Sequence, residues 1–420
     1  MSRRRLLAGR FAALLTVACA PVEGPPPGLP PEPALAEPAI RVALRVVDLQ
    51  MDVGGGHALV LRDSLGVPVL ELPEGVAVQA VRSGDRIALR LEDVSVGPFP
   101  MVAITPRDSA GLVRIRGREY RGTVQLWPSG PGVVVVNRLG MEAYLAGVIN
   151  AEMGRRAVED SAALSAQAIV SRTFALLALG RPRAPQYDVL ATVADQAYGG
   201  VGAELSQGWD ALRATRGQVL TYEGRPIEAF FHSTCGGRTA AGEEVFVNGG
   251  LPYLRSVSDA SPDGTSWCAR SPRYRWAERW TAAALEETLR HTLPPLGTDR
   301  SRISELEDVT VTAYTPSGRV SGLGFRFRGG TVPVSGSPAV RQVLRPAPGG
   351  GTGDLLRSAS FRIVLGREGG RLVRVTADGG GAGHGVGFCQ WGAVGRSRAG
   401  ATATGILAAY FPGTSIERRW

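Results

Sequence analysis

The sequence contains no lysine: all 47 of its basic residues are arginine, and it has only four histidines and four cysteines. The formal net charge is +9, which would suit a polyanionic partner such as nucleic acid or cell wall. The arginines are scattered and form no basic, aromatic-rich stripe or helix, which argues against nucleic-acid binding. With 56 glycines and 29 prolines, the composition indicates a genome rich in G and C and a fold with many turns and short strands.

The start of the chain lacks a hydrophobic run long enough to span a bilayer. Residues 1–19 join an arginine-rich beginning to a short apolar run, Phe11–Ala18, and end at Cys19. This pattern predicts an export signal, and the context of Cys19 resembles a lipobox, in which the cysteine is lipidated. Residues 20–38 are rich in proline and predict an extended linker. We expect a protein exported to the periplasm or cell envelope, with a lipid on Cys19 as its membrane anchor.

Residues 39–138 contain short runs that are either apolar throughout or alternate between apolar and polar residues. Turn residues separate these runs. This pattern predicts a β-rich N-terminal domain. The segment has no paired carboxylates, no metal-ligand spacing and no candidate catalytic histidine, and His57 fits a turn better than a ligand. We interpret this part as a scaffold or wall-binding module.

From residue 139 onwards helical patterns join the strands. A strand-like stretch near Met141 leads into one long helix with apolar and small residues at helical spacing, ending at Gly180. A second helix is predicted over 281–291, among several further strands. The fold class we predict is α+β, with a β-rich N-terminal region followed by an α+β core over 139–420. The core has one long helix after Ala151-Glu152-Met153 and several antiparallel strands.

Four segments, in this order, resemble the SpoIID/LytB family. They are YLAGVINAEMGRRAVEDSAALSAQAIVSRTFAL, DQAYGG, FFHSTCGGRTAAGEEVF, and GHGVGFCQWGA followed by ILAAYFPGT. One such segment would be weak support, but four in order are specific, and they lie within residues 139–416. The resemblance implies a secreted protein with a SpoIID-type catalytic domain. It also implies lytic transglycosylase activity on peptidoglycan glycan strands, in particular strands already stripped of stem peptides.

The resemblance assigns the catalytic acid to Glu152. Cleavage of a glycosidic bond needs a general acid whose pKa is raised by an apolar pocket. A hydrolase usually needs a second carboxylate, whereas in a transglycosylase the sugar's own 6-hydroxyl attacks the anomeric carbon. Glu152 would then accept that hydroxyl's proton and leave a 1,6-anhydro-MurNAc end.

Two other functions stay open beside the enzyme. One is a non-catalytic peptidoglycan-binding modifier that stimulates an N-acetylmuramoyl-L-alanine amidase, as the LytB branch implies. The other is a structural lipoprotein that grips denuded glycan. The arginine-only composition and lipobox-like start fit a non-sporulating bacterium better than a sporulating one.

The same segments supply candidates for substrate binding. His384 is expected to line the groove opposite Glu152, with Phe388 or Trp391 as an apolar wall. The polar residues on the long helix fit helix–sheet packing equally well, and the tyrosine fits a core position as well as a sugar-stacking one. The full set is Gln167, Ser171, Arg172, Tyr198, Ser233, Gly236, Gly237, Arg238, Thr239, His384 and Gln390.

The cysteines allow three roles. A Cys389–His384 nucleophile pair is disfavoured, because the two are five residues apart on a glycine-rich loop with no evident Asn or Asp to orient the histidine. Outside the cytoplasm we expect a disulfide, with Cys235–Cys268 as the preferred pair. The competing arrangement is a structural zinc held by His232, Cys235 and Cys268, with Cys389 as a further ligand. Apart from such a zinc, we expect no cofactor.

Overall fold

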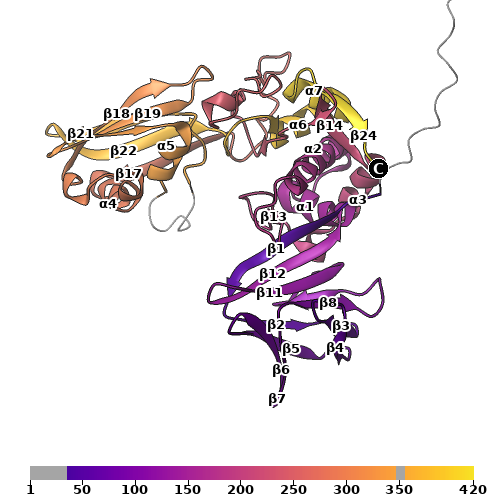
Figure 1. The fold of residues 1–420 in the computed structure, drawn as a ribbon. Helices are drawn as coiled ribbons and strands as arrows, with labels where there is room; N and C mark the ends of the chain where they lie inside the picture. The colour runs from indigo at the N-terminus through magenta and orange to yellow at the C-terminus, as the bar shows by residue number, and fades with distance from the viewer. Residues whose placement is uncertain (1–35, 347–354) are drawn as a thin grey trace, which may run out of the picture. The chain divides into compact units, whose positions relative to one another are not determined.

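The computed structural model describes residues 36–346 and 355–420. The predicted export signal, Cys19 and most of the proline-rich linker therefore lie outside the described residues. Residues from Ala36 to Trp420 form one compact unit. It joins a strand-only N-terminal region to helices and further, mostly antiparallel sheets, which confirms the predicted α+β class (Figure 1).

The N-terminal region is built from two sheets, as the alternating pattern predicts. Buried and more exposed residues alternate in β9 and over Thr123–Trp127 of β11. Val133–Val136 in β12 are all buried, and this central strand also contacts β2 and β5 of the other sheet. The strands are β1 (Ala39–Asp48), β2 (Gln50–Gly54), β3 (Leu59–Arg62), β4 (Pro68–Leu72), β5 (Ala77–Ser83), β6 (Arg86–Leu91), β7 (Val94–Phe99), β8 (Val102–Pro106), β9 (Val113–Ile115), β10 (Arg118–Tyr120), β11 (Thr123–Ser129) and β12 (Gly132–Gly140). Their sheet orders are β13-β1-β12-β11-β8-β3-β4, in which β13 is the later strand Val189–Leu190, and β10-β9-β2-β5-β6-β7.

A helical layer follows β12 directly. The strand-like entry predicted near Met141 is wrong, because Met141–Met153 form the helix α1. Ten of its thirteen residues are buried, so it shows no polar face from which a helical period could be recognised. The long helix predicted after the glutamate is confirmed as α2, Ser161–Leu179. The layer also contains α3 (Ser206–Ala214), α6 (Gln390–Arg398), α7 (Ala403–Tyr410), β13 (Val189–Leu190), β14 (Gln218–Tyr222), β15 (Arg225–Pro226) and β24 (Ser415–Arg418).

Residues Val158–Leu179 are long and apolar enough to cross a membrane by length and composition. Within the fold, however, 61% of this stretch is buried. Three alanines of this helix, Ala163, Ala166 and Ala168, are fully buried. Their small side chains let α2 approach its neighbours closely. We therefore interpret α2 as the central helix of the folded core.

A second hydrophobic core occupies residues 276–377. The helix predicted over 281–291 is confirmed as α4 (Ala282–Thr292), which Thr281 caps by accepting a hydrogen bond from the Ala284 N–H at 3.1 Å. Two three-stranded sheets, β17-β22-β21 and β18-β19-β20, complete this part. The elements are β17 (Arg275–Thr281), β18 (Leu306–Tyr314), β19 (Val320–Phe327), β20 (Gly330–Ser335), α5 (Ser337–Val343), β21 (Phe361–Glu368) and β22 (Arg371–Gly380).

Two short parallel strands join the motifs that flank this second core. In β16 (Phe231–His232) and β23 (Phe388–Cys389), Phe231 pairs with Phe388 and His232 with Cys389. The pairing places the FFHSTCGG segment beside the GHGVGFCQWGA segment. Single 3₁₀ turns complete the described secondary structure: Val158–Asp160, Gly200–Ala203, Gly242–Glu244, Pro294–Leu296 and Arg300–Arg302.

Candidate active site

Glu152 lies in the last turn of α1, one residue before the helix ends. Gly154, with a φ of 68°, then turns the chain away from the helix. The backbone N–H of Ala197 donates a hydrogen bond of 2.6 Å to Glu152 Oε1. The side chain of Gln390 lies near enough to the same carboxylate to lower its pKa. This carboxylate therefore lies beside segments from three of the four motifs.

Burial is the largest influence on the Glu152 carboxyl and raises its pKa above the usual value. The hydrogen bond from Ala197 and the nearby Gln390 side chain favour the charged form and lower the pKa, opposing part of that shift. A carboxyl held in one orientation and biased toward its protonated form can deliver a proton to a bound oxygen. These are the properties that a general acid needs.

Glu152 lines a cavity of about 650 Å³, which is within the usual range for binding sites. The predicted partner of Glu152 in this groove, His384, lines the same cavity together with Gly383. The other lining residues come from α2, from the loops around residues 183–195, from the FFHS segment and from the second core. They are Phe174, Arg183, Val193, Ala194, Asp195, Phe230, Phe231, His232, Ser233, Phe246, Arg273, Arg341, Leu355, Ala382 and Gln390.

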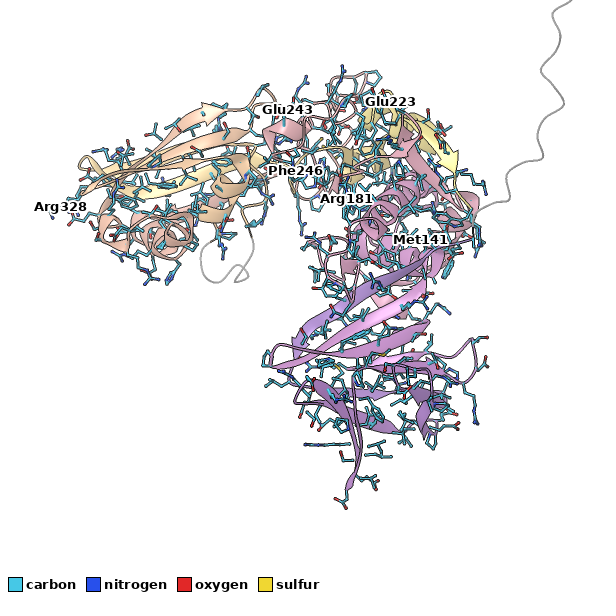
Figure 2. The ribbon with its side chains drawn as sticks, viewed as in Figure 1. Met141, Arg181, Glu223, Glu243, Phe246 and Arg328 are labelled. Carbon is cyan, nitrogen blue, oxygen red and sulfur yellow. The ribbon has the colours of Figure 1, made fainter. Side chains whose placement is uncertain are left out.

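Aromatic rings form the apolar wall of the cavity. Phe230 and Phe246 are stacked with ring centroids 4.5 Å apart, and the His384 ring lies edge-on at 6.0 Å and 5.4 Å from them. Phe246 is labelled in Figure 2. Flat apolar rings of this kind can pack against the apolar face of a sugar. The wall was predicted at Phe388 or Trp391, but Phe388 is fully buried and neither residue lines the cavity.

His384 is a neutral group in this cavity. Burial, reinforced by the nearby positive charge of Arg341, lowers its pKa to about 4. The backbone N–H of Val386 donates to His384 Nδ1 at 3.1 Å, so the ring proton resides on Nε2. Behind it, His232 Nδ1 hydrogen-bonds to the carbonyl of Val386 at 3.1 Å. The Phe231 backbone raises the pKa of His384 as a nearby acceptor, so a sugar oxygen would compete with it for the Nε2 proton of the neutral ring.

A second carboxylate, Asp195, also lines the cavity. Arg183 pairs with it, and the backbone N–H of Leu190 donates to its Oδ2 at 2.8 Å. Only 4% of the Asp195 side chain is exposed. These contacts hold Asp195 as one half of an ion pair, which disfavours it as a base that activates water or as a nucleophile.

Four of the predicted site residues are brought together by the fold: Glu152, Ser233, His384 and Gln390 line one cavity. Gln167 lies directly behind them, because Gln390 Nε2 donates to Gln167 Oε1 at 3.4 Å. Gln167 in turn donates to Ser171 Oγ at 2.9 Å. Both Gln167 and Ser171 are fully buried. They belong to a hydrogen-bonded row that orients Gln390, and neither lines the cavity.

Arg172 and Tyr198 are core residues, and their predicted contact with substrate is not supported. Arg172 is fully buried and forms a two-point ion pair with Glu142, with N–O distances of 2.7 and 2.9 Å. Tyr198 packs against Tyr144 and donates its hydroxyl to Asn137 Oδ1 at 2.8 Å. For both residues, the packing alternative recognised from the sequence is the one that the structure adopts.

The GGRT turn also lies away from the cavity lining. Gly236 and Gly237 have φ angles of 80° and 120°, so the predicted tight turn is present, but it packs against Gly380 and Gly381. The carbonyl of Arg238 accepts a hydrogen bond from Arg319, and the buried hydroxyl of Thr239 accepts one from the Val257 N–H. The turn thus organises neighbouring loops and not a sugar subsite.

Cys235, Cys268 and Cys389 are buried and unpaired. The Sγ atoms of Cys235 and Cys268 are 3.5 Å apart, so the preferred disulfide is not formed, although its two partners are adjacent as predicted. Cys389 is fully buried, accepts hydrogen bonds from two backbone N–H groups and does not line the cavity, which is inconsistent with a nucleophile. His232 is not among the potential metal ligands around these sulfurs, whereas Asp259 is.

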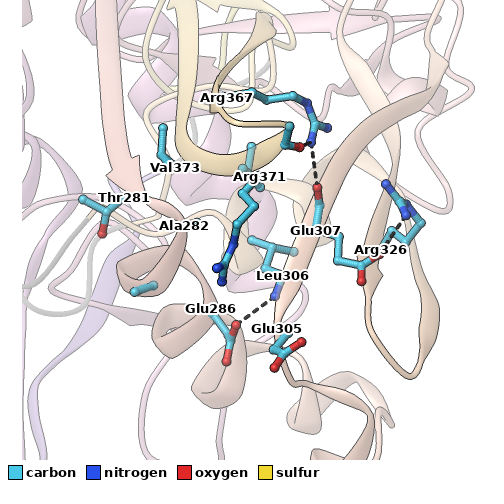
Figure 3. A pocket seen from close by; sticks show the side chains of 13 residues that line it. Thr281, Ala282, Glu286, Glu305, Leu306, Glu307, Arg326, Arg367, Arg371 and Val373 are labelled. Atoms are coloured by element: carbon cyan, nitrogen blue, oxygen red, sulfur yellow. Dashed lines mark hydrogen bonds and ion pairs between the residues drawn. The ribbon is translucent and has the colours of Figure 1, made fainter.

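A different cavity lies in the second core, between α4, β18 and the β21–β22 turn (Figure 3). Its charged groups are largely engaged with one another: Glu286 accepts from the Leu306 N–H at 2.8 Å, and Arg326 pairs with Glu307 at 2.7 Å. Arg367 binds the Glu307 carbonyl at 3.2 Å. This cavity shares no lining residue with the one around Glu152, and we find no candidate acid–base pair among its described residues.

Comparison with known proteins identifies the family to which the chain belongs. The model of the family described as Stage II sporulation protein (SpoIID) matches residues 129–222, which include Glu152 and Ala197. Stage II sporulation protein D of Bacillus subtilis is 30% identical over 298 residues, covering 67% of this chain and 76% of the relative. The chain belongs to the SpoIID family. Members of the SpoIID/LytB group are linked to the bacterial cell wall and its degradation.

Two further matches extend this assignment. An uncharacterized protein of Brachyspira hyodysenteriae is 29% identical over 336 residues, covering 79% of this chain and 80% of the relative. A protein named amidase enhancer, from Bacillus subtilis, is 25% identical over 329 residues, covering 73% of this chain and 45% of the relative. Residues 263–387 match a separate family, a domain of unknown function (DUF8618), which includes the whole second core of this SpoIID member.

Proposed function

We propose that the protein is an exported lytic transglycosylase that cleaves peptidoglycan glycan strands, with Glu152 as both acid and base. The observation that carries the proposal is the Glu152 carboxyl itself: it is held by Ala197, lies near Gln390, has a raised pKa, and faces an aromatic-walled cavity. The nearby carboxylate, Asp195, is engaged by Arg183. A single available acid suits a reaction in which the substrate supplies its own nucleophile.

The proposed reaction balances without water. Protonated Glu152 gives its proton to the glycosidic oxygen of the leaving sugar, and the bond from that oxygen to the anomeric carbon breaks. The 6-hydroxyl oxygen of the same muramic acid residue forms a bond to the anomeric carbon. Its proton passes to the Glu152 carboxylate, which returns the acid to its starting form. The products are a new glycan end with a free hydroxyl and a 1,6-anhydro-MurNAc end.

The other residues would position the strand. His384 would donate its Nε2 proton to a sugar oxygen, and Phe230 and Phe246 would pack against a sugar face. In the cell, the substrate would be reached after export, with a lipid on Cys19 as the proposed membrane anchor. Glycan strands without stem peptides are the proposed substrate, because the resemblance to the SpoIID/LytB family implies them.

The decisive experiment is digestion of peptide-free glycan strands in water labelled with heavy oxygen. A transglycosylase gives anhydro ends that carry no label, whereas a hydrolase gives reducing ends that carry it, and mass spectrometry separates the two. Labelled reducing ends alone would overturn the proposal. Unchanged strands would favour the second candidate.

That second candidate is a peptidoglycan-binding protein that stimulates an N-acetylmuramoyl-L-alanine amidase. The similarity to the amidase enhancer of Bacillus subtilis favours it. Its test is a purified cell-wall amidase assayed on intact peptidoglycan, with and without this protein. A rate increase that survives Glu152→Gln, together with unchanged glycan strands, would support the modifier over the enzyme.

A further inference from the structure

Four buried side chains converge beside the cavity: Cys235, Asp259, Cys268 and Cys389. Their ligand atoms, three sulfurs and one carboxylate oxygen, all lie within 4.8 Å of one another. None of the four side chains is more than 2% exposed. We propose that they form a closed, four-ligand zinc site, a role independent of the transglycosylase proposal.

The spacing of the sulfurs fits a metal better than a covalent bond. Cys235 Sγ and Cys268 Sγ are 3.5 Å apart. Two sulfurs bound at about 2.3 Å to a tetrahedral zinc lie roughly 3.8 Å from each other. A disulfide instead needs about 2.05 Å between them. Little movement therefore separates the observed arrangement from zinc coordination.

Backbone N–H groups point at the sulfurs, as expected where thiolates bind a metal. Cys389 Sγ accepts from the N–H of Cys235 at 3.2 Å and from that of Gly392 at 3.3 Å. Cys235 Sγ accepts from the N–H of Gly237 at 3.4 Å. The positive φ angles at Gly236 and Gly237 direct the Gly237 N–H at the sulfur of Cys235.

Asp259 is oriented for the fourth position. Tyr410 donates its hydroxyl to Asp259 Oδ1 at 2.6 Å, and Arg396 Nη2 lies 3.6 Å from the same oxygen. These contacts leave Oδ2 directed toward the sulfurs, where it lies 3.2 Å from Cys235 Sγ. An outer group that fixes a ligating carboxylate is a usual part of a built metal site.

Chemistry of the ligands selects zinc. Thiolate-rich tetrahedral sites favour zinc over the hard cations calcium and magnesium, which require oxygen ligands. Several buried negative groups so close together are costly to keep ionised without a cation among them. Four protein ligands leave no open position, which is typical of a structural site and not of a catalytic one.

The position of the site shows what it would stabilise. Cys235 comes two residues after Ser233, and Cys389 directly precedes Gln390, so two of its ligands adjoin residues of the Glu152 cavity. Asp259 and Cys268 come from the loop before β17, where the second core begins. Zinc would therefore cross-link three loops that the β16–β23 pairing and backbone bridges such as Thr234–Ala382 and Arg238–Ser258 already bring together.

The test uses the full chain carrying Cys19→Ser, so that the remaining thiols are those of the cluster. We expect one zinc per chain by elemental mass spectrometry, and X-ray absorption should report three sulfur ligands and one oxygen ligand. Replacement of zinc by cobalt alone should give the intense sulfur-to-metal bands of a tetrahedral thiolate site. These measurements need no further substitution, so they decide the question even if a cluster variant fails to fold.

Variants then assign the ligands. Cys268→Ser and Asp259→Asn should each lower zinc affinity at least tenfold in a chelator competition. Tyr410→Phe, which leaves all four ligands, should lower it by about 10–100-fold. Ser337→Ala is the control, since Ser337 is equally buried but donates to the Val320 carbonyl in the second core. Metal-free protein, whether with three free thiols or with a mapped Cys235–Cys268 disulfide, overturns the proposal.

Discussion

The Ala197 backbone N–H and the Glu152 carboxylate meet at 2.6 Å across 45 residues of sequence. The DQAYGG segment therefore acts on the proposed acid through its main chain and not through a side chain. Because a backbone donor survives most substitutions at its own position, the orientation of Glu152 depends on where this loop is held. The Arg183–Asp195 ion pair and the hydrogen bond from Leu190 to Asp195 hold it.

Glu152→Gln keeps the shape of the side chain and removes its transferable proton. We expect release of anhydro-ended glycan to fall by about a hundred- to ten-thousand-fold, while the strand still binds. Product release is followed by mass spectrometry and binding by sedimentation with insoluble glycan. The matched control is Glu159→Gln on the exposed turn before α2, which should keep full activity. Normal cleavage by the Glu152 variant would contradict the assignment of the acid.

The pH dependence should follow the raised pKa of Glu152. Because the acid form is active, activity is present below this pKa and is lost as the pH rises through it. The Gln390 side chain lowers the pKa, so Gln390→Met should move the alkaline limb of kcat/KM to higher pH. A limb that stays in place, or moves to lower pH, would show that Gln390 does not tune this group.

Phe246→Ala should weaken glycan binding by about three- to tenfold, because it removes one ring of the stacked aromatic pair. The effect should be seen in KM more than in kcat. Tyr198→Phe provides the contrast: it removes the hydroxyl bonded to Asn137, so it should cost about 1 kcal/mol of stability with KM unchanged. A KM change for the Tyr198 variant would show that its hydroxyl contacts the glycan, which the structure does not support.

Arg172→Met should reduce the free energy of unfolding by about 3–5 kcal/mol, because it leaves Glu142 buried without its partner. Denaturant unfolding measures the change. The double variant Arg172→Met with Glu142→Gln should recover part of the loss, since no uncompensated charge remains. If the single variant lost activity with unaltered stability, Arg172 would belong to the site after all.

Local patterns in the sequence predict much of this fold. Alternation identifies the N-terminal strands, and spacing identifies α2 and α4. The helix α1 was missed because burial on nearly all sides removes the helical period. The second core was not recognised as a separate unit, because its β17–β22 pairing joins residues about a hundred positions apart, a distance that no local pattern spans.

The site was predicted unevenly for a related reason. The motifs that resemble the family contain four polar residues that the fold brings to one cavity: Glu152, Ser233, His384 and Gln390. Phe230 and Phe246 lie in a quoted motif, yet nothing in their residue type distinguishes a cavity wall from a core. Asp259 sits in a turn-like stretch, SDASPDG, and its burial depends on Tyr410, which is 151 residues away.

The segment that forms the second core begins and ends at neighbouring points in space, because Arg275 and Gly380 are partners in the β17–β22 ladder. The described residues between them form the second core, and two of these residues, Arg341 and Leu355, line the Glu152 cavity. Such an architecture separates the acid from part of its enclosure. Replacement of the second core would therefore change one wall of the cavity while Glu152, Ala197 and Gln390, which lie outside that core, kept their places. Under the proposed function, strand selection and bond cleavage would then rest on separable parts of the chain.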